Sequence, residues 1–229
     1  MPEAKSFTRR APNRRPRLFK VGDARAALAD FDRGCETTCY TFGQFSIIDV
    51  IVALLGKTGP ADVVISTWTA GAADLRRASE LMHDRRIRSC RWIVDHSFKN
   101  RQPEYLETMV GLFGADSIRS LKTHAKFVVV SNDEWNIVVR TSMNLNENRR
   151  LENFDVVDDE AFCRWHLDLT EGVFADRAAG DWVDRDDLDL SGVADTPPEY
   201  TCEVGRASFG RVYEKGVASV GPVRPVRRA

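Results

Sequence analysis

The chain has 229 residues, of which 43% are hydrophobic and 29% are charged, and its formal net charge is −1 at pH 7. This balance is ordinary for a folded globular protein and excludes a chain that is disordered throughout. The length suits one sizeable α/β domain with tails, or at most two small domains, and we expect a single core.

The charge is unevenly distributed along the chain. Residues 1–20 carry seven basic side chains and one acidic side chain, which gives this arm a net charge of about +6, and a compensating acidic stretch runs from Glu152 to Asp189. A basic arm can bind the phosphates of a nucleic acid by counterion release. It can equally be a solvated, disordered tail, and the arm by itself does not favour either interpretation.

Hydropathy and cysteine spacing indicate a reduced, cytoplasmic protein. No run of roughly 18 or more uncharged apolar residues is present, and the first residues lack the apolar segment of a secretory signal. The five cysteines, at positions 35, 39, 90, 163 and 202, are odd in number and irregularly spaced. They predict free, mostly buried thiols and no disulfide framework.

The chain divides into a basic disordered arm over residues 1–20, one α/β domain over residues 21–191 and a flexible tail over residues 192–229. Both ends are rich in Arg and Pro and show no apolar period, whereas apolar runs alternate with amphipathic stretches between them. The elements expected in chain order are a helix over Ala24–Phe31, a strand over Thr37–Phe42, a helix over Phe45–Leu55, a strand over Ala61–Thr67, a helix over Ala72–Arg86, a strand over Arg88–Asp95, a helix over Glu104–Phe113, strands over Ser117–Leu121, Ala125–Val130 and Trp135–Arg140, an extended segment over Phe154–Val157 and a helix over Asp159–Phe174. Turn residues Asn132 and Asp133 predict a hairpin between the last two of these strands.

Two familiar patterns are incomplete. The run from Leu55 to Thr58 resembles the end of a phosphate-binding loop, but the glycine required five residues before Gly56 is Ile51. Gly56 is therefore interpreted as the stop of the preceding helix. Cys35 and Cys39 lack a third cysteine or a histidine pair at metal-binding spacing, so no metal site is expected.

Two histidines carry no functional pattern of their own. His83 falls in the polar part of a predicted helix, and His166 falls beside Trp165 in the last one. For both we predict a structural or solvent-facing role and no catalysis.

The segment from Thr123 to Asp155 is the part of the sequence that indicates chemistry. In an extended strand, residues two apart point to one face, so His124 and Lys126 are expected to project side by side. Ser142 and Asn144 repeat this spacing after the next strand. An imidazole nucleophile beside an ammonium and an amide suits attack on a phosphate, with Lys126 and Asn144 neutralising the developing charge. For the pair His124 and Lys126 alone, a strand with polar residues facing water is the favoured alternative.

The whole segment resembles the half-site signature of the phospholipase D-like superfamily, in its nuclease-like branch. The matching residues are His124-Ala-Lys126, then Thr141-Ser-Met-Asn144, then the acid of Asn153-Phe-Asp155, and the match spans about thirty residues. The resemblance implies a mixed β-sheet flanked by helices on both faces. It also implies catalytic roles for His124, Lys126, Asn144, Ser142 and Asp155.

One position departs from the family pattern. The superfamily often has an aspartate five residues after the lysine, and here that residue is Ser131. We therefore expect Asp155 to orient the ring of His124 and treat Asp133 as a turn residue.

The resemblance implies a covalent phosphohistidine, a second histidine that protonates the leaving oxygen, and no metal or other cofactor. Only one half motif is present, because His96 is followed by Lys99 one position too late. A homodimer that brings two copies of His124 together is the simplest arrangement.

For the substrate we prefer nucleic acid, DNA or RNA, because of the basic arm and the lack of an amphipathic membrane segment. His96, Lys99 and Arg101 follow a predicted strand and are candidate substrate contacts. A simple capped loop explains that stretch equally well. The alternatives are a catalytically weak relative that binds nucleic acid or serves in an assembly, and, third, a phospholipid phosphodiesterase.

Overall fold

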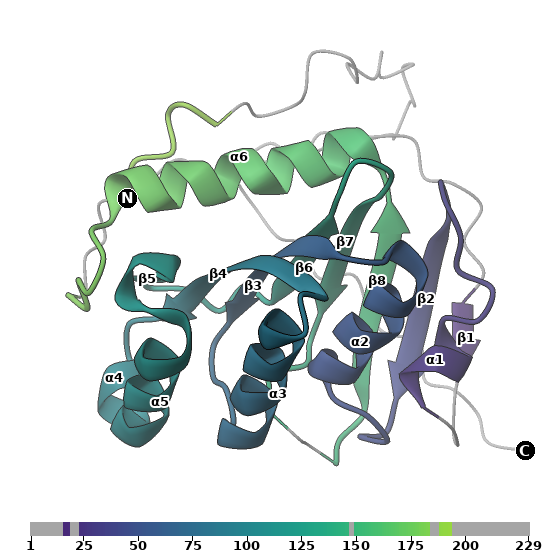
Figure 1. The fold of residues 1–229 in the computed structure, drawn as a ribbon, viewed down its shortest axis with the longest axis horizontal. Helices are drawn as coiled ribbons and strands as arrows, with labels where there is room; N and C mark the ends of the chain where they lie inside the picture. Colours follow the sequence, from purple (N-terminus) through teal and green to yellow (C-terminus); the bar gives the residue numbers. More distant parts are fainter. Residues whose placement is uncertain (1–15, 19–22, 147–148, 184–187, 194–229) are drawn as a thin grey trace, which may run out of the picture.

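Eight strands form one mixed sheet in the computed structural model, which describes residues 16–18, 23–146, 149–183 and 188–193 (Figure 1). The order across the sheet is β1-β2-β8-β7-β6-β3-β4-β5. Strands β3, β4 and β5 are parallel, whereas β3, β6, β7, β8 and β2 pair in antiparallel fashion and β1 pairs in parallel with β2. The strands are β1 (Pro16–Leu18), β2 (Glu36–Thr41), β3 (Ala61–Thr67), β4 (Ile87–Asp95), β5 (Ile118–Leu121), β6 (Phe127–Ser131), β7 (Asn136–Thr141) and β8 (Glu152–Asp158).

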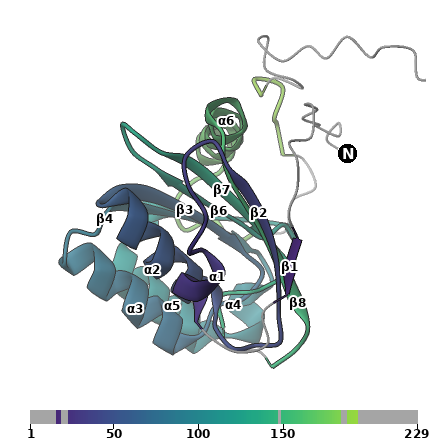
Figure 2. The same ribbon diagram turned by 90° about the vertical axis from the view of Figure 1, so that its right-hand side faces the viewer.

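Helices cover both faces of the sheet, which confirms the predicted fold class. Helices α1, α2, α3 and α5 lie on one face, and α6 crosses the opposite face (Figures 1 and 2). The helical elements are α1 (Ala24–Ala27), α2 (Ile47–Thr58), α3 (Ala72–His83), α4 (Phe98–Arg101), α5 (Pro103–Phe113), a short 3-10 turn (Ala115–Ser117) and α6 (Glu160–Asp176).

The sequence period explains which side of each element is buried. In β3, Val63 and Ile65 pack in the core under α2, whereas Val64 between them packs in the core under α6. Helix α6 presents Phe162, Cys163, His166, Thr170 and Val173 as its buried residues, at the three- and four-residue spacing of one helix face. The central strands are therefore apolar on both faces, as a sheet between two helical layers requires.

Several helix ends differ from their predicted positions, and α3, for example, ends at His83 and not at Arg86. Helix α1 ends at Ala27, because the chain then tightens into three-residue turns in which Phe31 N donates to Leu28 O at 3.1 Å. The interpretation of Gly56 as a helix stop is wrong. Helix α2 continues to Thr58 and ends where Gly59 adopts a φ of 70°, a conformation that side chains disfavour.

The turn residue Asn132 joins the predicted hairpin to α2. Its Oδ1 accepts hydrogen bonds from the backbone N–H groups of Glu134 and Trp135, at 3.0 and 2.9 Å, which confirms the hairpin between β6 and β7. Its Nδ2 donates to Thr58 O at 3.0 Å, so the same side chain caps the carbonyl end of α2.

Most of the predicted arm and tail lies outside the described residues. Of the arm, Pro16–Leu18 is described and forms β1 at the edge of the sheet. Of the tail, Gly192 and Val193 are described, and Val193 is buried against Gly172 of α6. None of the helices in the described ranges is both long enough and apolar enough to cross a membrane.

The described cysteines are all free thiols, as the spacing predicted. Cys39, Cys90 and Cys163 are buried and Cys35 is exposed. Burial raises the pKa of the Cys90 and Cys163 thiols well above their usual range, so both stay protonated and unreactive at neutral pH.

His166 is a structural residue in the core beneath α6, with its ring against those of Phe127, Phe162 and Trp165. Its Nδ1 lies 2.9 Å from Phe162 O, and burial lowers its pKa to about 4. The imidazole is therefore neutral at pH 7 in the folded protein.

A pH dependence of stability follows from this buried imidazole. The unfolded chain binds a proton at His166 near pH 6.5 and the folded chain only near pH 4, so the free energy of unfolding should fall as the pH decreases through that window. The loss should reach about 3 kcal/mol. Urea unfolding of the parent and of His166→Gln at pH 7 and about pH 4.5 measures it. The variant should lack this part of the loss, and equal losses in both proteins would exclude His166 as the cause.

Candidate active site

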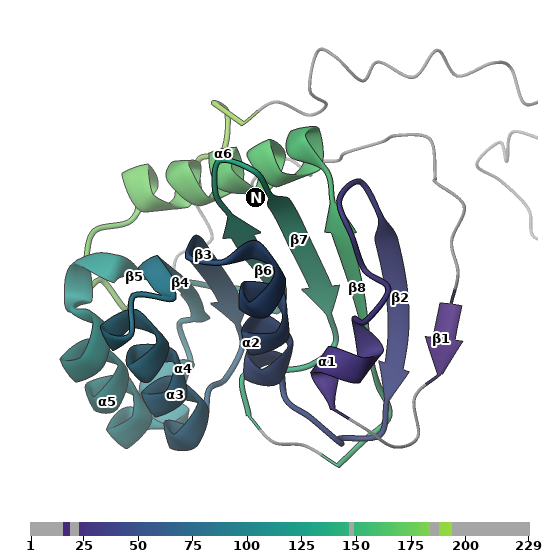
Figure 3. The same cartoon turned by 45° about the vertical axis from the view of Figure 1, so that its right-hand side comes forward.

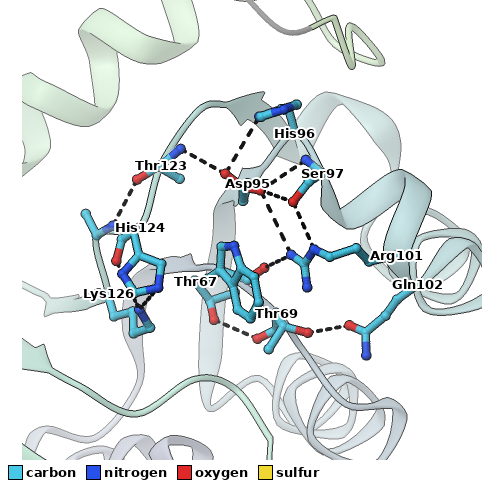
Figure 4. Close-up of polar contacts among 12 residues, drawn as sticks. Thr67, Thr69, Asp95, His96, Ser97, Arg101, Gln102, Thr123, His124 and Lys126 are labelled. Carbon is cyan, nitrogen blue, oxygen red and sulfur yellow. Dashed lines mark hydrogen bonds and ion pairs between the residues drawn. The ribbon is translucent and has the colours of Figure 1, made fainter.

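Several polar and aromatic side chains meet at the edge of the sheet where β3, β4 and β5 end. These three strands are parallel, and β6 is antiparallel to β3, so β6 begins at the same edge. The end of β4 and the loop before β6 thereby lie at one edge of the sheet (Figure 3), which brings Asp95 near His124 (Figure 4). Trp68, which follows β3, lies beside His124. The carboxyl ends of parallel strands are where α/β proteins usually form their sites.

His124 and Lys126 lie side by side in this loop. The Nζ of Lys126 is 3.2 Å from Nδ1 and 3.3 Å from Nε2 of His124, and it donates to His124 O at 3.0 Å (Figure 4). His124 is exposed and Lys126 is half-buried. Burial lowers the pKa of the Lys126 ammonium, and the charge of Glu152 partly counteracts this. An exposed imidazole is therefore in contact with a partly desolvated ammonium.

The cause of this adjacency differs from the one predicted. Strand β6 begins at Phe127, so His124 and Lys126 precede it and do not alternate along it. A turn holds them instead, in which the Ala125 N–H donates to Thr123 Oγ1 at 3.1 Å. Ala125, which lies between them, is exposed.

The carboxylate of Asp95 fixes the position of this turn. Asp95 is 6% exposed, and its Oδ2 accepts from Thr123 N at 3.0 Å, one residue before His124. Its Oδ1 accepts from Ser97 N at 3.0 Å and from Ser97 Oγ. The end of β4 is thus connected to the candidate nucleophile through a buried charge-assisted hydrogen bond.

Arg101 and Trp68 complete the wall beside His124. The guanidinium of Arg101 lies 3.7 Å from the centroid of the Trp68 ring, and its Nη2 donates to Trp68 O at 2.8 Å. The Trp68 ring in turn lies 5.7 Å from the His124 ring. The sequence analysis did not predict a role here for Trp68 or Asp95. Trp68 follows the last residue of the apolar strand β3, and Asp95 is the last residue of the apolar strand β4.

The three predicted substrate contacts lie on and before the short helix α4. Arg101 belongs to the cluster just described, and its Nη2 is also 3.9 Å from Asp95 Oδ1. His96 Nδ1 is 3.7 Å from Asp95 Oδ2, and Lys99 is exposed on α4. Contact of these three side chains with a substrate stays a prediction.

The segment from Thr141 to Asn146 runs along the same edge. Leu145 N donates to Thr69 O at 3.2 Å, next to Trp68, so Asn144 is held beside the β3 end. Ser142 Oγ accepts from Asn153 N at 2.9 Å and donates to Glu152. Its described contacts therefore run to β8 and its catalytic role stays a prediction.

Asn144 and Asn146 each carry a buried side-chain oxygen with no hydrogen-bond partner in the described ranges. Buried polar atoms are normally paired, and an unpaired acceptor oxygen needs a hydrogen-bond donor as its partner. The amide that the sequence predicts to face a phosphate at Asn144 would act through its N–H donors and not through this oxygen.

Asp155 lies on the α6 face of β8. Its Oδ1 accepts from Thr38 Oγ1 at 2.6 Å, and its Oδ2 is 3.8 Å from Arg140 Nη2. These described contacts do not include His124, and the predicted orienting role stays a prediction. Glu152 at the start of β8 is the acid whose charge acts on Lys126, and sequence reasoning did not select it.

The departure at Ser131 does not affect the candidate site. Ser131 ends β6, whereas His124 precedes its beginning. Four residues of strand beyond Phe127 correspond to about 13 Å, so a carboxylate at this position would lie at the far end of the strand from His124.

The part of the chain that the structure describes contains no group of three or more His, Cys, Asp or Glu side chains that could hold a metal ion. Neither a family model nor a curated protein matches the chain.

Several solved structures are similar to the chain at low sequence identity. NucT from Helicobacter pylori is 16% identical with a TM-score of 0.47, over 57% of this chain and 91% of that one. Nuc from Salmonella typhimurium is 13% identical with a TM-score of 0.45, over 63% and 96% of the two chains. A phosphatidylserine synthase from Haemophilus influenzae is 14% identical with a TM-score of 0.43, over 59% and 37%. The solved structures to which this chain is similar thus include Nuc, which is described as a phospholipase D family member.

Proposed function

We propose that the chain is a metal-independent phosphodiesterase that acts through a phosphohistidine at His124. The observation that carries the proposal is the contact of the Lys126 ammonium with both ring nitrogens of an exposed His124, at 3.2 and 3.3 Å. A phosphate that approaches the imidazole there must also approach the ammonium, which would neutralise its charge.

The proposed reaction has two steps. A ring nitrogen of His124 attacks phosphorus, the bond to the leaving oxygen breaks, and an acid protonates that oxygen. In the second step the deprotonated form of that acid takes a proton from water, and the water oxygen attacks phosphorus. The bond between phosphorus and the ring nitrogen breaks, which releases the phosphate product and restores the imidazole. Lys126 and the side-chain N–H groups of Asn144 donate to the non-bridging oxygens in both steps.

The acid in this scheme is assigned to His124 of a second copy. One chain carries one H-x-K motif, and a two-fold axis would supply a neutral imidazole to attack and a protonated one to donate. The edge position and the exposure of His124 support access by a partner.

Nucleic acid, DNA or RNA, is the proposed substrate. The net charge of about +6 in residues 1–20 supports a contribution of counterion release to affinity. Arg101, which packs on the Trp68 ring beside His124, adds a basic group. The catalytic domain in this proposal is residues 21–191.

The function is tested by the hydrolysis of bis(p-nitrophenyl) phosphate in excess EDTA. We expect turnover to continue, because Lys126 and Asn144 supply the charge neutralisation that a metal supplies in other nucleases. Release of p-nitrophenol measures the rate. Loss of turnover in EDTA that a divalent ion restores would contradict this chemistry, and so would a parent protein that never cleaves the ester.

A further inference from the structure

A cavity adjoins the candidate site on the α6 face of the sheet. Its volume is about 510 Å³, within the range of small-molecule sites. Lys126 and Ser142 line it, so it begins where the candidate site ends. The remaining lining residues are Ala125, Phe127, Arg140, Thr141, Asn153, Asp155, Trp165, His166 and Leu169.

One wall of this cavity is flat and apolar. Trp165 is half-buried, and its ring lies 5.0 Å from that of His166 at an interplanar angle of 78°. His166 is itself packed against Phe127 with ring centroids 5.1 Å apart. The edge contact with the packed His166 ring helps to hold the Trp165 ring in place, and an aromatic ring that lines a cavity can stack on a planar ring. The His166 imidazole is neutral at pH 7, because burial lowers its pKa.

The other wall presents donors and an acceptor. Arg140 Nη2 is 3.8 Å from Asp155 Oδ2 and 3.9 Å from Glu36 Oε1, both longer than a hydrogen bond. Its guanidinium can thus turn N–H groups toward a ligand without losing a close bond to either carboxylate. Asp155 is held in place by Thr38. Polar groups opposite an aromatic wall match the edge of a heterocycle, whereas an acyl chain would remove them from water without offering a hydrogen bond.

We infer that this cavity binds the nucleobase next to the scissile phosphate, with the base stacked on Trp165 and its edge facing Arg140 and Asp155. Lys126 lines this cavity and also contacts His124, so the base and the phosphate can belong to one nucleotide. The inference rests on the proposed function and adds to it a residue-level contact with the substrate. Because stacking is tolerant of sequence, the subsite would accept any of the bases.

Two substrates with the same leaving group test the subsite. Thymidine 5′-(p-nitrophenyl phosphate) carries a base and methyl p-nitrophenyl phosphate does not. Trp165→Ala should raise the KM for the thymidine ester by about 10- to 100-fold, the usual effect of losing one base-stacking contact. The kcat/KM for the methyl ester should stay within about twofold of the parent value, because the Lys126 side of the site is intact.

Two further variants keep the test informative. Arg164 precedes Trp165 on α6, is exposed and forms an ion pair of 3.9 Å with Glu160. Arg164→Ala is therefore the control, and it should leave the kinetics on both esters unchanged. Trp165→Phe keeps an aromatic face and should restore most of the affinity for the thymidine ester. Equal losses on the two esters, or no change on the thymidine ester, would overturn the inference.

Binding separates this inference from the proposed function. Titration calorimetry with thymidine 5′-monophosphate needs no turnover, so it applies even if the parent cleaves neither ester. Weaker binding by Trp165→Ala than by the parent supports the subsite, and equal binding overturns it. Cleavage of phospholipid vesicles that Trp165→Ala reduces, with nucleotide binding unchanged, would assign the cavity to an acyl chain and also overturn it.

Discussion

His124→Ala should reduce the hydrolysis of bis(p-nitrophenyl) phosphate by more than about 10³-fold, because the variant lacks the proposed nucleophile and no described residue at this edge repeats its environment. The free energy of unfolding should stay within about 0.5 kcal/mol of the parent value, since the imidazole is exposed. Initial rates and urea unfolding midpoints measure the two effects. His83→Ala, an exposed histidine at the end of α3, is the matched control and should keep full activity. An active His124→Ala protein would refute the mechanism.

The same variant tests the composite site. If two copies of His124 form one site, a mixed dimer lacks one of the two imidazoles and is inactive. Activity in mixtures of parent and His124→Ala subunits should then fall as the square of the parent fraction. A linear fall would mean that each chain works alone, and the acid would then be sought in the same chain, with His96 as the first candidate.

Lys126→Ala should lower kcat by on the order of 10² to 10³, which is the usual cost of removing one preorganised charge from a transition state. The ammonium is partly desolvated and lies against His124, so its attraction to a phosphate is stronger than that of a solvated lysine. Lys126→Arg keeps the positive charge but replaces the compact ammonium with a planar guanidinium, so it should retain part of the rate.

Steady-state kinetics on the bis(p-nitrophenyl) ester measure the loss. Lys57→Ala is the control, because Lys57 lies at the end of α2 and donates to Ala29 O at 3.1 Å. A Lys126→Ala protein with kcat within about threefold of the parent would show that the ammonium does not stabilise the transferring phosphoryl group.

The sequence by itself determined the motif and most of the elements, although β1 and α4 were not predicted. The apolar runs of β3 and β4 and the three- and four-residue spacing of α6 are local patterns, and local patterns fix which side of an element is buried. The H-x-K spacing likewise predicted that His124 and Lys126 are adjacent. The two side chains are adjacent, but a turn and not a strand brings them together. The prediction is still correct because residues two apart in the chain are close in either conformation.

Tertiary structure alone decided what surrounds that pair. Asp95 is 28 residues from Thr123 in the chain, and Trp68 reaches His124 only because β3, β4 and β5 end at one edge. The cavity beneath α6 arises in the same way, since Trp165 of the helix and Arg140 and Asp155 of the sheet line it together. Such contacts depend on strand order and on the side of the sheet that a helix covers. Periodicity reports a buried face but not the residues that face it, and so these neighbours could not be read from the sequence.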